Sequence, residues 1–165
     1  MEYGPPNLTL RRASLGDSES LLHWRNDPAT RAFSLDGKAV AAEEHKIWLD
    51  KTLQDSGCLF LIGEIDEQLV GMARINLIKD SGFGRVSINM NPEFRGRGLS
   101  RQLLKESLEI SREIFPTISQ YVAEIHVYNL ASKKLFESLG FAKVHDSTSK
   151  DFESYSVDSD FLKTS

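Results

Sequence analysis

A stretch rich in arginine and glycine lies just past the middle of the chain and offers the groups that bind an anion. It reads NPEFRGRGLSRQLL, residues 91–104. A turn that leads into a helix presents unpaired backbone N–H groups and the positive end of the helix dipole. Gly96 and Gly98 carry no side chain, so an anion can approach the backbone, and arginine adds guanidinium groups for phosphate oxygens. The alternative is a solvated surface turn, because the pattern is short and is neither a dinucleotide fingerprint nor a P-loop. The arginines are Arg95, Arg97 and Arg101.

The composition narrows the class of protein that could hold such a site. The chain has 165 residues, of which 40% are hydrophobic and 27% charged, as expected for one domain over residues 1–165. The net charge of −4 argues against a nucleic-acid partner. A single cysteine, Cys58, excludes a disulfide framework and a cysteine-rich zinc site, and its apolar neighbours predict a buried thiol. No apolar run approaches membrane-spanning length and no signal peptide is recognisable, so we expect a cytoplasmic protein without a membrane partner.

Hydrophobic periodicity predicts the elements that position the candidate site. The expected order is β-α-α-β-β-β-α-β-α-β-β, with residues 30–37 irregular. Three consecutive strands form an antiparallel meander, and the later elements form strand–helix–strand crossovers, so the class is mixed α/β (α+β). The expected strands are residues 7–13, 58–66, 68–78, 85–91, 119–129, 141–146 and 151–161, and the expected helices are residues 15–27, 40–57, 95–115 and 130–140.

Two motifs in this order resemble those of the GNAT superfamily of N-acetyltransferases. Residues 95–100, RGRGLS, are similar to the acetyl-CoA loop [RQ]-x-x-G-x-[GA], with Ser100 in place of Gly or Ala. Residues 129–141, NLASKKLFESLGF, are similar to N-x-x-[AS]-x-x-x-[YF]-x-x-x-G-F. The resemblance spans essentially the whole chain. It implies a GNAT fold, with a mixed central sheet of about seven strands and helices on both faces. It also implies acetyl-CoA as cosubstrate and no metal.

The resemblance also implies how acetyl-CoA would bind. It would lie between two splayed parallel strands, residues 86–90 and 123–127, against freed main-chain groups of the first strand. The arginine–glycine loop would cap the pyrophosphate, and Asn129 and Ser132 would contact the pantetheine arm. A plain helix N-cap is the alternative role for Asn129. The implied cofactor-binding residues are Ile88, Asn89, Met90, Arg95, Gly96, Arg97, Gly98, Leu99, Ser100, Arg101, Asn129 and Ser132.

Acetyl transfer needs a base for the amine and a proton for the thiolate. By resemblance to ribosomal-protein Nα-acetyltransferases, Glu124 is the candidate base. A strand carboxylate paired with an arginine is the alternative. His126 shares its face and is interpreted as structural or as a proton relay. Phe136 stands where many GNAT enzymes carry a tyrosine acid. The proton would then come from Tyr128, Ser132 or water, or the thiolate would leave unaided; the protein could also bind CoA without catalysis.

The N-terminal half is expected to hold the acceptor. The segments LLHWRND and EEHKIW resemble those of the sugar-nucleotide N-acetyltransferases of the pseudaminic-acid and flagellin-glycan branch. Trp24 and Trp48 offer flat ring faces for a sugar or base. Arg25 offers a forked guanidinium for a diphosphate, and Asn26 and His45 offer hydrogen bonds. The alternative packs both tryptophans in the core and leaves the arginine solvated.

These patterns favour an N-acetyltransferase that acts on an amino-sugar nucleotide of the UDP-4-amino-sugar type. One alternative is a protein Nα- or ribosomal-protein N-acetyltransferase, and another is a degenerate CoA-binding sensor or scaffold. The expected partner is a small-molecule amine, and an exposed edge near the C-terminal hairpin would allow a homodimer.

Overall fold

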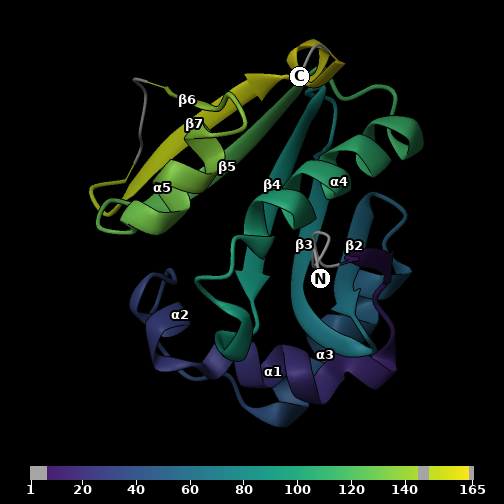
Figure 1. Ribbon diagram of the computed structural model, residues 1–165, viewed down its shortest axis with the longest axis vertical. Helices are drawn as coiled ribbons and strands as arrows, with labels where there is room; N and C mark the ends of the chain where they lie inside the picture. The colour runs from purple at the N-terminus through teal and green to yellow at the C-terminus, as the bar shows by residue number, and fades with distance from the viewer. Residues whose placement is uncertain (1–6, 145–148, 164–165) are drawn as a thin grey trace, which may run out of the picture.

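A mixed seven-stranded sheet runs through the molecule in the order β1-β2-β3-β4-β5-β7-β6 (Figure 1). The computed structural model describes residues 7–144 and 149–163. The strands are β1 (Thr9–Arg12), β2 (Cys58–Ile65), β3 (Gln68–Ile78), β4 (Phe83–Met90), β5 (Gln120–His126), β6 (Ala142–Lys143) and β7 (Phe152–Asp158). The α-helices are α1 (Ser18–Asn26), α2 (Pro28–Ala32), α3 (Ala42–Gln54), α4 (Leu99–Ile114) and α5 (Leu130–Glu137). Three short 3-10 helices are η1 (Leu15–Asp17), η2 (Pro92–Phe94) and η3 (Ser159–Lys163). The mixed α/β class and the expected order of strands are confirmed.

One helix was not expected from the sequence. The short helix α2 begins at Pro28, inside a region where no regular element was predicted. Its N-cap is Asp27, whose Oδ2 accepts hydrogen bonds from the backbone N–H groups of Ala29 and Thr30 at 3.1 and 3.3 Å. Proline at the first helical position has no N–H to leave unpaired, so it favours this start. The strand predicted at residues 141–146 is represented by β6, and its last two residues lie outside the described part of the chain.

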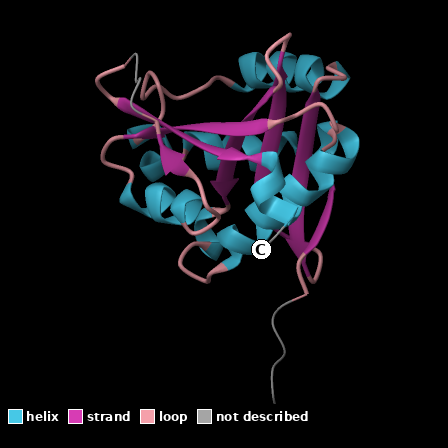
Figure 2. Ribbon diagram, turned by 90° about the horizontal axis from the view of Figure 1, so that it is seen from above, coloured by secondary structure: helices cyan, strands magenta, loops and turns pink. Residues whose placement is uncertain are grey.

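Helices cover both faces of the sheet (Figure 2). Alternate residues of β2 point to opposite faces: Leu59 and Leu61 pack in the cluster that holds α4 and α5, and Phe60 and Ile62 in the cluster of α1 and α3. The predicted burial of Cys58 is confirmed. No helix in residues 7–144 and 149–163 is long and apolar enough to cross a membrane.

Two glycines of the sheet allow α4 to approach closely. A Cβ at Gly63 would lie 3.0 Å from Leu103, and one at Gly71 would lie 3.1 Å from it. Leu103, Leu104 and Leu108 are fully buried, and burying each leucine contributes about 1.5–3 kcal/mol. The leucines of α4 therefore anchor this helix, and with it the turn that precedes it, on the sheet.

The sheet divides between β4 and β5. These parallel strands pair only at their beginnings, from Phe83 with Gln120 to Arg85 with Val122. Beyond this point β4 stays paired with β3 as far as Met90, and β5 stays paired with β7 as far as His126. Figure 1 shows β5 and β7 diverging from β4 and β3. The expected separation of the two parallel strands is confirmed, and it frees main-chain groups of β4 that a sheet would otherwise pair.

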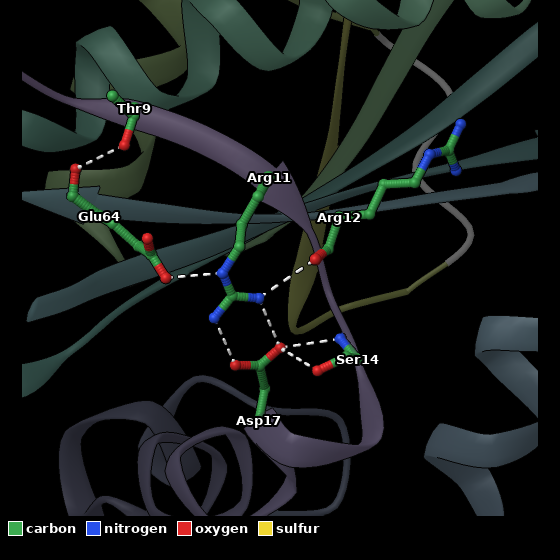
Figure 3. A network of polar contacts seen from close by, with 6 residues as sticks. All are labelled: Thr9, Arg11, Arg12, Ser14, Asp17 and Glu64. Carbon is green, nitrogen blue, oxygen red and sulfur yellow. Dashed lines mark hydrogen bonds and ion pairs between the residues drawn. The ribbon is translucent and has the colours of Figure 1, made fainter. Parts of the chain in front are cut away.

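A partly buried ion-pair network ties β1 to η1 and β2 (Figure 3). Arg11 donates to both carboxylate oxygens of Asp17, at 2.9 and 2.7 Å, and to Glu64 Oε1 at 2.6 Å. Asp17 is 4% exposed and also accepts from the N–H of Ser14 at 2.8 Å. The Arg11 guanidinium holds the pKa of Asp17 below its usual range, although burial opposes this shift. The network therefore fixes where the chain leaves β1 and enters α1.

Asp17→Asn is expected to lower the free energy of unfolding by about 2 kcal/mol at neutral pH, because a charged hydrogen-bond pair is lost. The folded-state pKa of Asp17 lies below its unfolded value of 3.8, so its stabilisation is present above about pH 4 and is lost as pH falls below that. Urea unfolding at neutral and acidic pH measures this, and the difference between variant and wild type should shrink in acid. Asp50→Asn on the exposed face of α3 is the matched control. A difference in the free energy of unfolding that does not change with pH would contradict the prediction.

Candidate active site

A cavity of about 600 Å³ opens where β4 and β5 separate. Its walls come from α1 and α2 on one side and from the arginine–glycine loop, α4 and α5 on the other. The residues that line it are Arg25, Ala29, Thr30, Phe33, Ser34, Met72, Val86, Ser87, Ile88, Asn89, Met90, Phe94, Arg95, Gly96, Arg97, Gly98, Leu99, Ser100, Glu124, Ile125, His126, Asn129, Ala131, Ser132, Leu135 and Phe136.

The arginine–glycine loop forms one end of the cavity at the N-terminus of α4. Gly96 and Gly98 adopt left-handed backbone conformations with φ of 72° and 74°, and Gly98 is the N-cap of α4. A Cβ at either glycine would meet no atom within 4 Å, so the space above the backbone is open to a ligand. The first N–H groups of a helix have no intrahelical acceptor. The loop therefore has the shape and polarity of an anion site, which fits the pyrophosphate of acetyl-CoA.

The three arginines of the loop point in different directions. Arg95 donates to Asp27 Oδ2 at 2.8 Å and to Thr30 Oγ1 at 2.9 Å. The guanidinium of Arg97 lies 4.7 Å from the centre of the Phe94 ring. Arg101 is outside the cavity lining and donates to a backbone carbonyl of α5's C-cap at 3.4 Å. The structure thus brings two of the three arginines to the cavity, while Arg101 faces α5 because it lies on another side of the helix.

The strand and helix residues expected to contact pantetheine all line the cavity. Ile88, Asn89 and Met90 do so from β4, at the height where β5 has left the sheet. Asn129 Oδ1 accepts from the N–H of Ser132 at 3.1 Å, so Asn129 is the N-cap of α5 and a cavity residue at once. The N-cap role is confirmed, and the contact with pantetheine stays a prediction that this position allows.

Glu124 and His126 project from the same face of β5 into the cavity. Glu124 is exposed there, and none of the ion pairs among the described residues involves it. His126 Nδ1 accepts from the N–H of Tyr128 at 3.2 Å, which leaves Nε2 as the donor of the neutral ring. The rings of Phe33 and Phe152 lie 5.4 and 5.3 Å from that imidazole. A carboxylate that takes part in no ion pair can accept a proton from a bound amine.

Neither Tyr128 nor the residue at position 136 can give a proton to the CoA thiolate from the cavity wall. Tyr128 is 78% exposed and does not line the cavity, so its placement does not support the predicted catalytic role. Phe136 lines it but is 2% exposed and packs edge to face with Phe141 at 4.9 Å. Ser132 is the remaining hydroxyl of those considered from sequence.

Trp24 and His45 lie in the core, away from the cavity. Trp24 is 2% exposed and packs with Leu49 and Ile62 beneath α1 and α3. His45 is 3% exposed, burial lowers its pKa, and its Nδ1 lies 3.4 Å from the hydroxyl of Ser18. Their predicted contact with the acceptor is therefore not supported, because Trp24 packs toward β2 and His45 is buried against Ser18 and Trp48.

Asn26 and Trp48 also lie outside the cavity lining. Asn26 exchanges two hydrogen bonds with the backbone of Val40, at 2.9 and 2.8 Å, and so holds the segment before α3. The Trp48 ring lies 5.1 Å from the guanidinium of Arg74 and 6.1 Å from the ring of Phe60 on β2. Neither placement supports a contact with the acceptor.

Arg25 is the one residue of the predicted acceptor set that lines the cavity. Its Nη2 lies 3.6 Å from Asp36 Oδ1, and its Nη1 is buried without a hydrogen-bond partner. Leaving a buried donor unpaired costs about 1–3 kcal/mol, more for a charged group. The Arg25 side chain as a whole is 30% exposed, so another part of its guanidinium can be reached from the cavity.

Sequence reasoning missed the contribution of the segment that begins with α2. Thr30, Phe33 and Ser34 line the cavity next to the loop, and Asp27 holds Arg95. The pattern Asp-Pro was available as a helix-start signal. The pairing of Asp27 with Arg95 was not, because 68 residues separate them.

Comparisons with known proteins agree with this geometry. The family model of the acetyltransferase (GNAT) domain matches residues 7–142. The structure of spermidine N-acetyltransferase from Vibrio cholerae with CoA and spermine is similar, with 18% identity and a TM-score of 0.83, over 95% of this chain and 98% of that chain. The yncA structure from Salmonella typhimurium with its cofactor acetyl-CoA shares 22% identity and a TM-score of 0.76, over 92% and 93% of the two chains. An acetyltransferase of the GNAT family from Streptococcus pneumoniae shares 19% identity and a TM-score of 0.71, over 92% and 99%.

At these identities the similar structures establish the fold alone. The match to the family model establishes the family and, with it, the type of activity. No curated protein matches the chain. The seven-stranded sheet with its separated strands, the glycine loop at the start of α4 and the match over residues 7–142 lead to the same assignment. The chain belongs to the acetyltransferase (GNAT) domain family and is an acetyl-CoA-dependent N-acetyltransferase.

Proposed function

We propose that this N-acetyltransferase acts on an amine whose acceptor molecule also carries an anionic group, specifically an amino-sugar nucleotide of the UDP-4-amino-sugar type. The observation that carries the proposal is Arg25, which lines the cavity, whose side chain is 30% exposed, and whose Nη2 lies 3.6 Å from Asp36. A diphosphate oxygen would accept a charged hydrogen bond from the exposed part of this guanidinium. The rings of Phe33 and His126 line the same cavity, 5.4 Å apart, and offer apolar faces to a sugar or base.

The charge of the cavity disfavours a polyamine, the kind of ligand bound in the V. cholerae structure. Glu124 is the only carboxylate among the described cavity-lining residues, and three arginines line the same space. Arg95 is paired with Asp27 at 2.8 Å and Arg25 lies 3.6 Å from Asp36, whereas Arg97 is in none of the ion pairs among the described residues. A polycation would therefore meet repulsion mainly from Arg97 and from Arg25, whose contact with Asp36 is long. This remaining positive charge supports an acceptor with negative charge.

On the donor side we assign acetyl-CoA to the groove between the separated strands. When bound, it supplies an acetyl group held as a thioester. The main chain of Ile88, Asn89 and Met90 would bind the pantetheine amides, as an added strand would. The N–H groups of residues 96–101 would hold the pyrophosphate, and Asn129 and Ser132 would contact the arm.

For the transfer itself we assign Glu124 as the base that accepts the amine proton, directly or through water. The departing thiolate would receive a proton from Ser132 or from water, since Phe136 has none to give. A thiol with a pKa near about 8.5 can also leave without a strong acid. Nε2 of His126, on the same face as Glu124, can donate to the acceptor.

Release of free thiol from acetyl-CoA tests the proposal against its alternatives. The acceptor panel comprises 4-amino sugar nucleotides, spermidine and peptides with free N-termini. Turnover with the sugar nucleotides supports the proposal, and turnover confined to spermidine or peptides contradicts it. CoA binding without release for any acceptor would favour a sensor.

Arg25→Gln is expected to raise KM for the sugar nucleotide about tenfold or more, because one charged hydrogen bond is lost. KM for acetyl-CoA should stay within about twofold, since Arg25 lies on the acceptor side. Arg25→Lys should fall between wild type and Gln, because a lysine keeps the charge but not the fork. Arg12→Gln, an exposed arginine on β1, is the control. An unchanged KM for the nucleotide in Arg25→Gln would contradict the acceptor assignment.

A further inference from the structure

A chain of side-chain contacts joins the arginine–glycine loop to the acceptor side of the cavity. Arg95 of the loop donates from Nη1 to Asp27 at 2.8 Å and from Nη2 to Thr30 Oγ1 at 2.9 Å. The Thr30 hydroxyl donates in turn to Asn89 Oδ1 on β4 at 3.2 Å. The loop, the start of α2 and the free part of β4 are therefore held by one set of contacts.

Asp27 is the centre of this set. The same oxygen that receives Arg95 also caps α2 by accepting from the N–H groups of Ala29 and Thr30. The side chain of Asp27 is 19% exposed and that of Arg95 is 35% exposed, so the pair is partly shielded from water. The hydrogen bond from Arg95 lowers the pKa of Asp27, which keeps the carboxylate charged at neutral pH.

These contacts direct Arg95 away from the open space above Gly96 and Gly98. Both Nη atoms are already engaged on the α2 side, and no Cβ-sized obstacle lies above either glycine. A phosphate in that space would meet backbone N–H groups, while the guanidinium of Arg95 is held by Asp27 and Thr30. Arg95 would have to break these two hydrogen bonds to turn both Nη atoms toward the phosphate.

We propose that Asp27 is a positioning residue for acetyl-CoA: through Arg95 it holds the loop in its anion-binding shape and couples that loop to the acceptor wall at α2. The proposal rests on the donor site proposed above. It changes the role expected for Arg95. Instead of binding the pyrophosphate, Arg95 would link the arginine–glycine loop to α2.

A double-mutant cycle, measured as CoA affinity, tests whether Asp27 acts through Arg95. Asp27→Asn keeps an oxygen that caps α2 but removes the charge, and Arg95→Gln removes the guanidinium. Calorimetric titration with CoA at neutral pH should show a Kd raised about fivefold in each variant, and no further rise in the double variant. Asp50→Asn on α3 is the control for a lost surface carboxylate. If Asp27→Asn binds CoA as tightly as wild type or more tightly while Arg95→Gln binds it weakly, Arg95 contacts the phosphate directly. The proposed role of Asp27 would then be wrong.

Hydrogen exchange gives a readout that loss of general stability would not reproduce. Saturating CoA should slow exchange at the α2 amides of Arg31 and Phe33 in wild type, and this slowing should vanish in both single variants at saturation. Slowing that persists in the variants would overturn the coupling. Failure of the wild type to bind CoA would instead contradict the proposed donor site, so the two failures are distinguishable.

Discussion

Gly98→Asp is expected to abolish measurable CoA binding. Gly98 caps α4 with φ of 74°, at the point where we place the pyrophosphate. An aspartate there sets a carboxylate against two phosphate charges, and each such contact at about 4 Å costs about 4 kcal/mol at a partly shielded site. The rise in Kd should therefore exceed about 100-fold. The fold should persist, because a carboxylate at a helix N-cap offsets part of the left-handed strain.

Gly98→Asn separates the charge from the backbone strain. Asparagine has nearly the same shape as aspartate and tolerates left-handed backbone, and the space above Gly98 is open. We expect this variant to bind CoA within about tenfold of wild type. Calorimetric titration of both variants, with thermal unfolding to check the fold, measures the difference. Equal affinity of the Asp and Asn variants would show that no phosphate lies at this position.

Glu124→Gln is expected to lower kcat by about 100-fold or more while Kd for CoA stays unchanged, the size of effect usual for a general base. Glu124 is exposed in the cavity and takes no part in the ion pairs of the described chain, so its replacement removes no structural contact of that kind. Initial rates of thiol release with the acceptor found active measure kcat, and titration measures Kd.

The pH dependence distinguishes a base from a residue that only binds. The deficit of Glu124→Gln should be largest at low pH and should shrink as pH rises, because more of the amine then arrives already deprotonated. Glu109→Gln on the exposed side of α4 is the matched control and should follow wild type throughout. A constant deficit across pH would remove Glu124 from the role of base.

The order of the elements was predictable because it depends on local pattern. The alternation in β2 and the leucines of α4 reflect burial on one face of each element, which a contiguous segment reveals. The short helix α2 was missed because it has five residues, too few for a periodic pattern, and depends on the Asp27 cap. The loop residues 95–100 were found because a glycine turn before a helix is itself contiguous.

The sequence by itself determined the fold class, because the pattern of each element depends on neighbours along the chain, and it supplied the acetyl-CoA loop and the base Glu124 as predictions through their resemblance to family motifs. Only the tertiary structure decided which acceptor candidates reach the cavity. Trp24 and His45 turn inward because α1 and α3 pack on β2, and Arg25 reaches the cavity from the same helix as Trp24. The partner of Arg95 likewise depends on how α2 folds back against β4, since contacts between residues 68 positions apart arise from packing and leave no local signal.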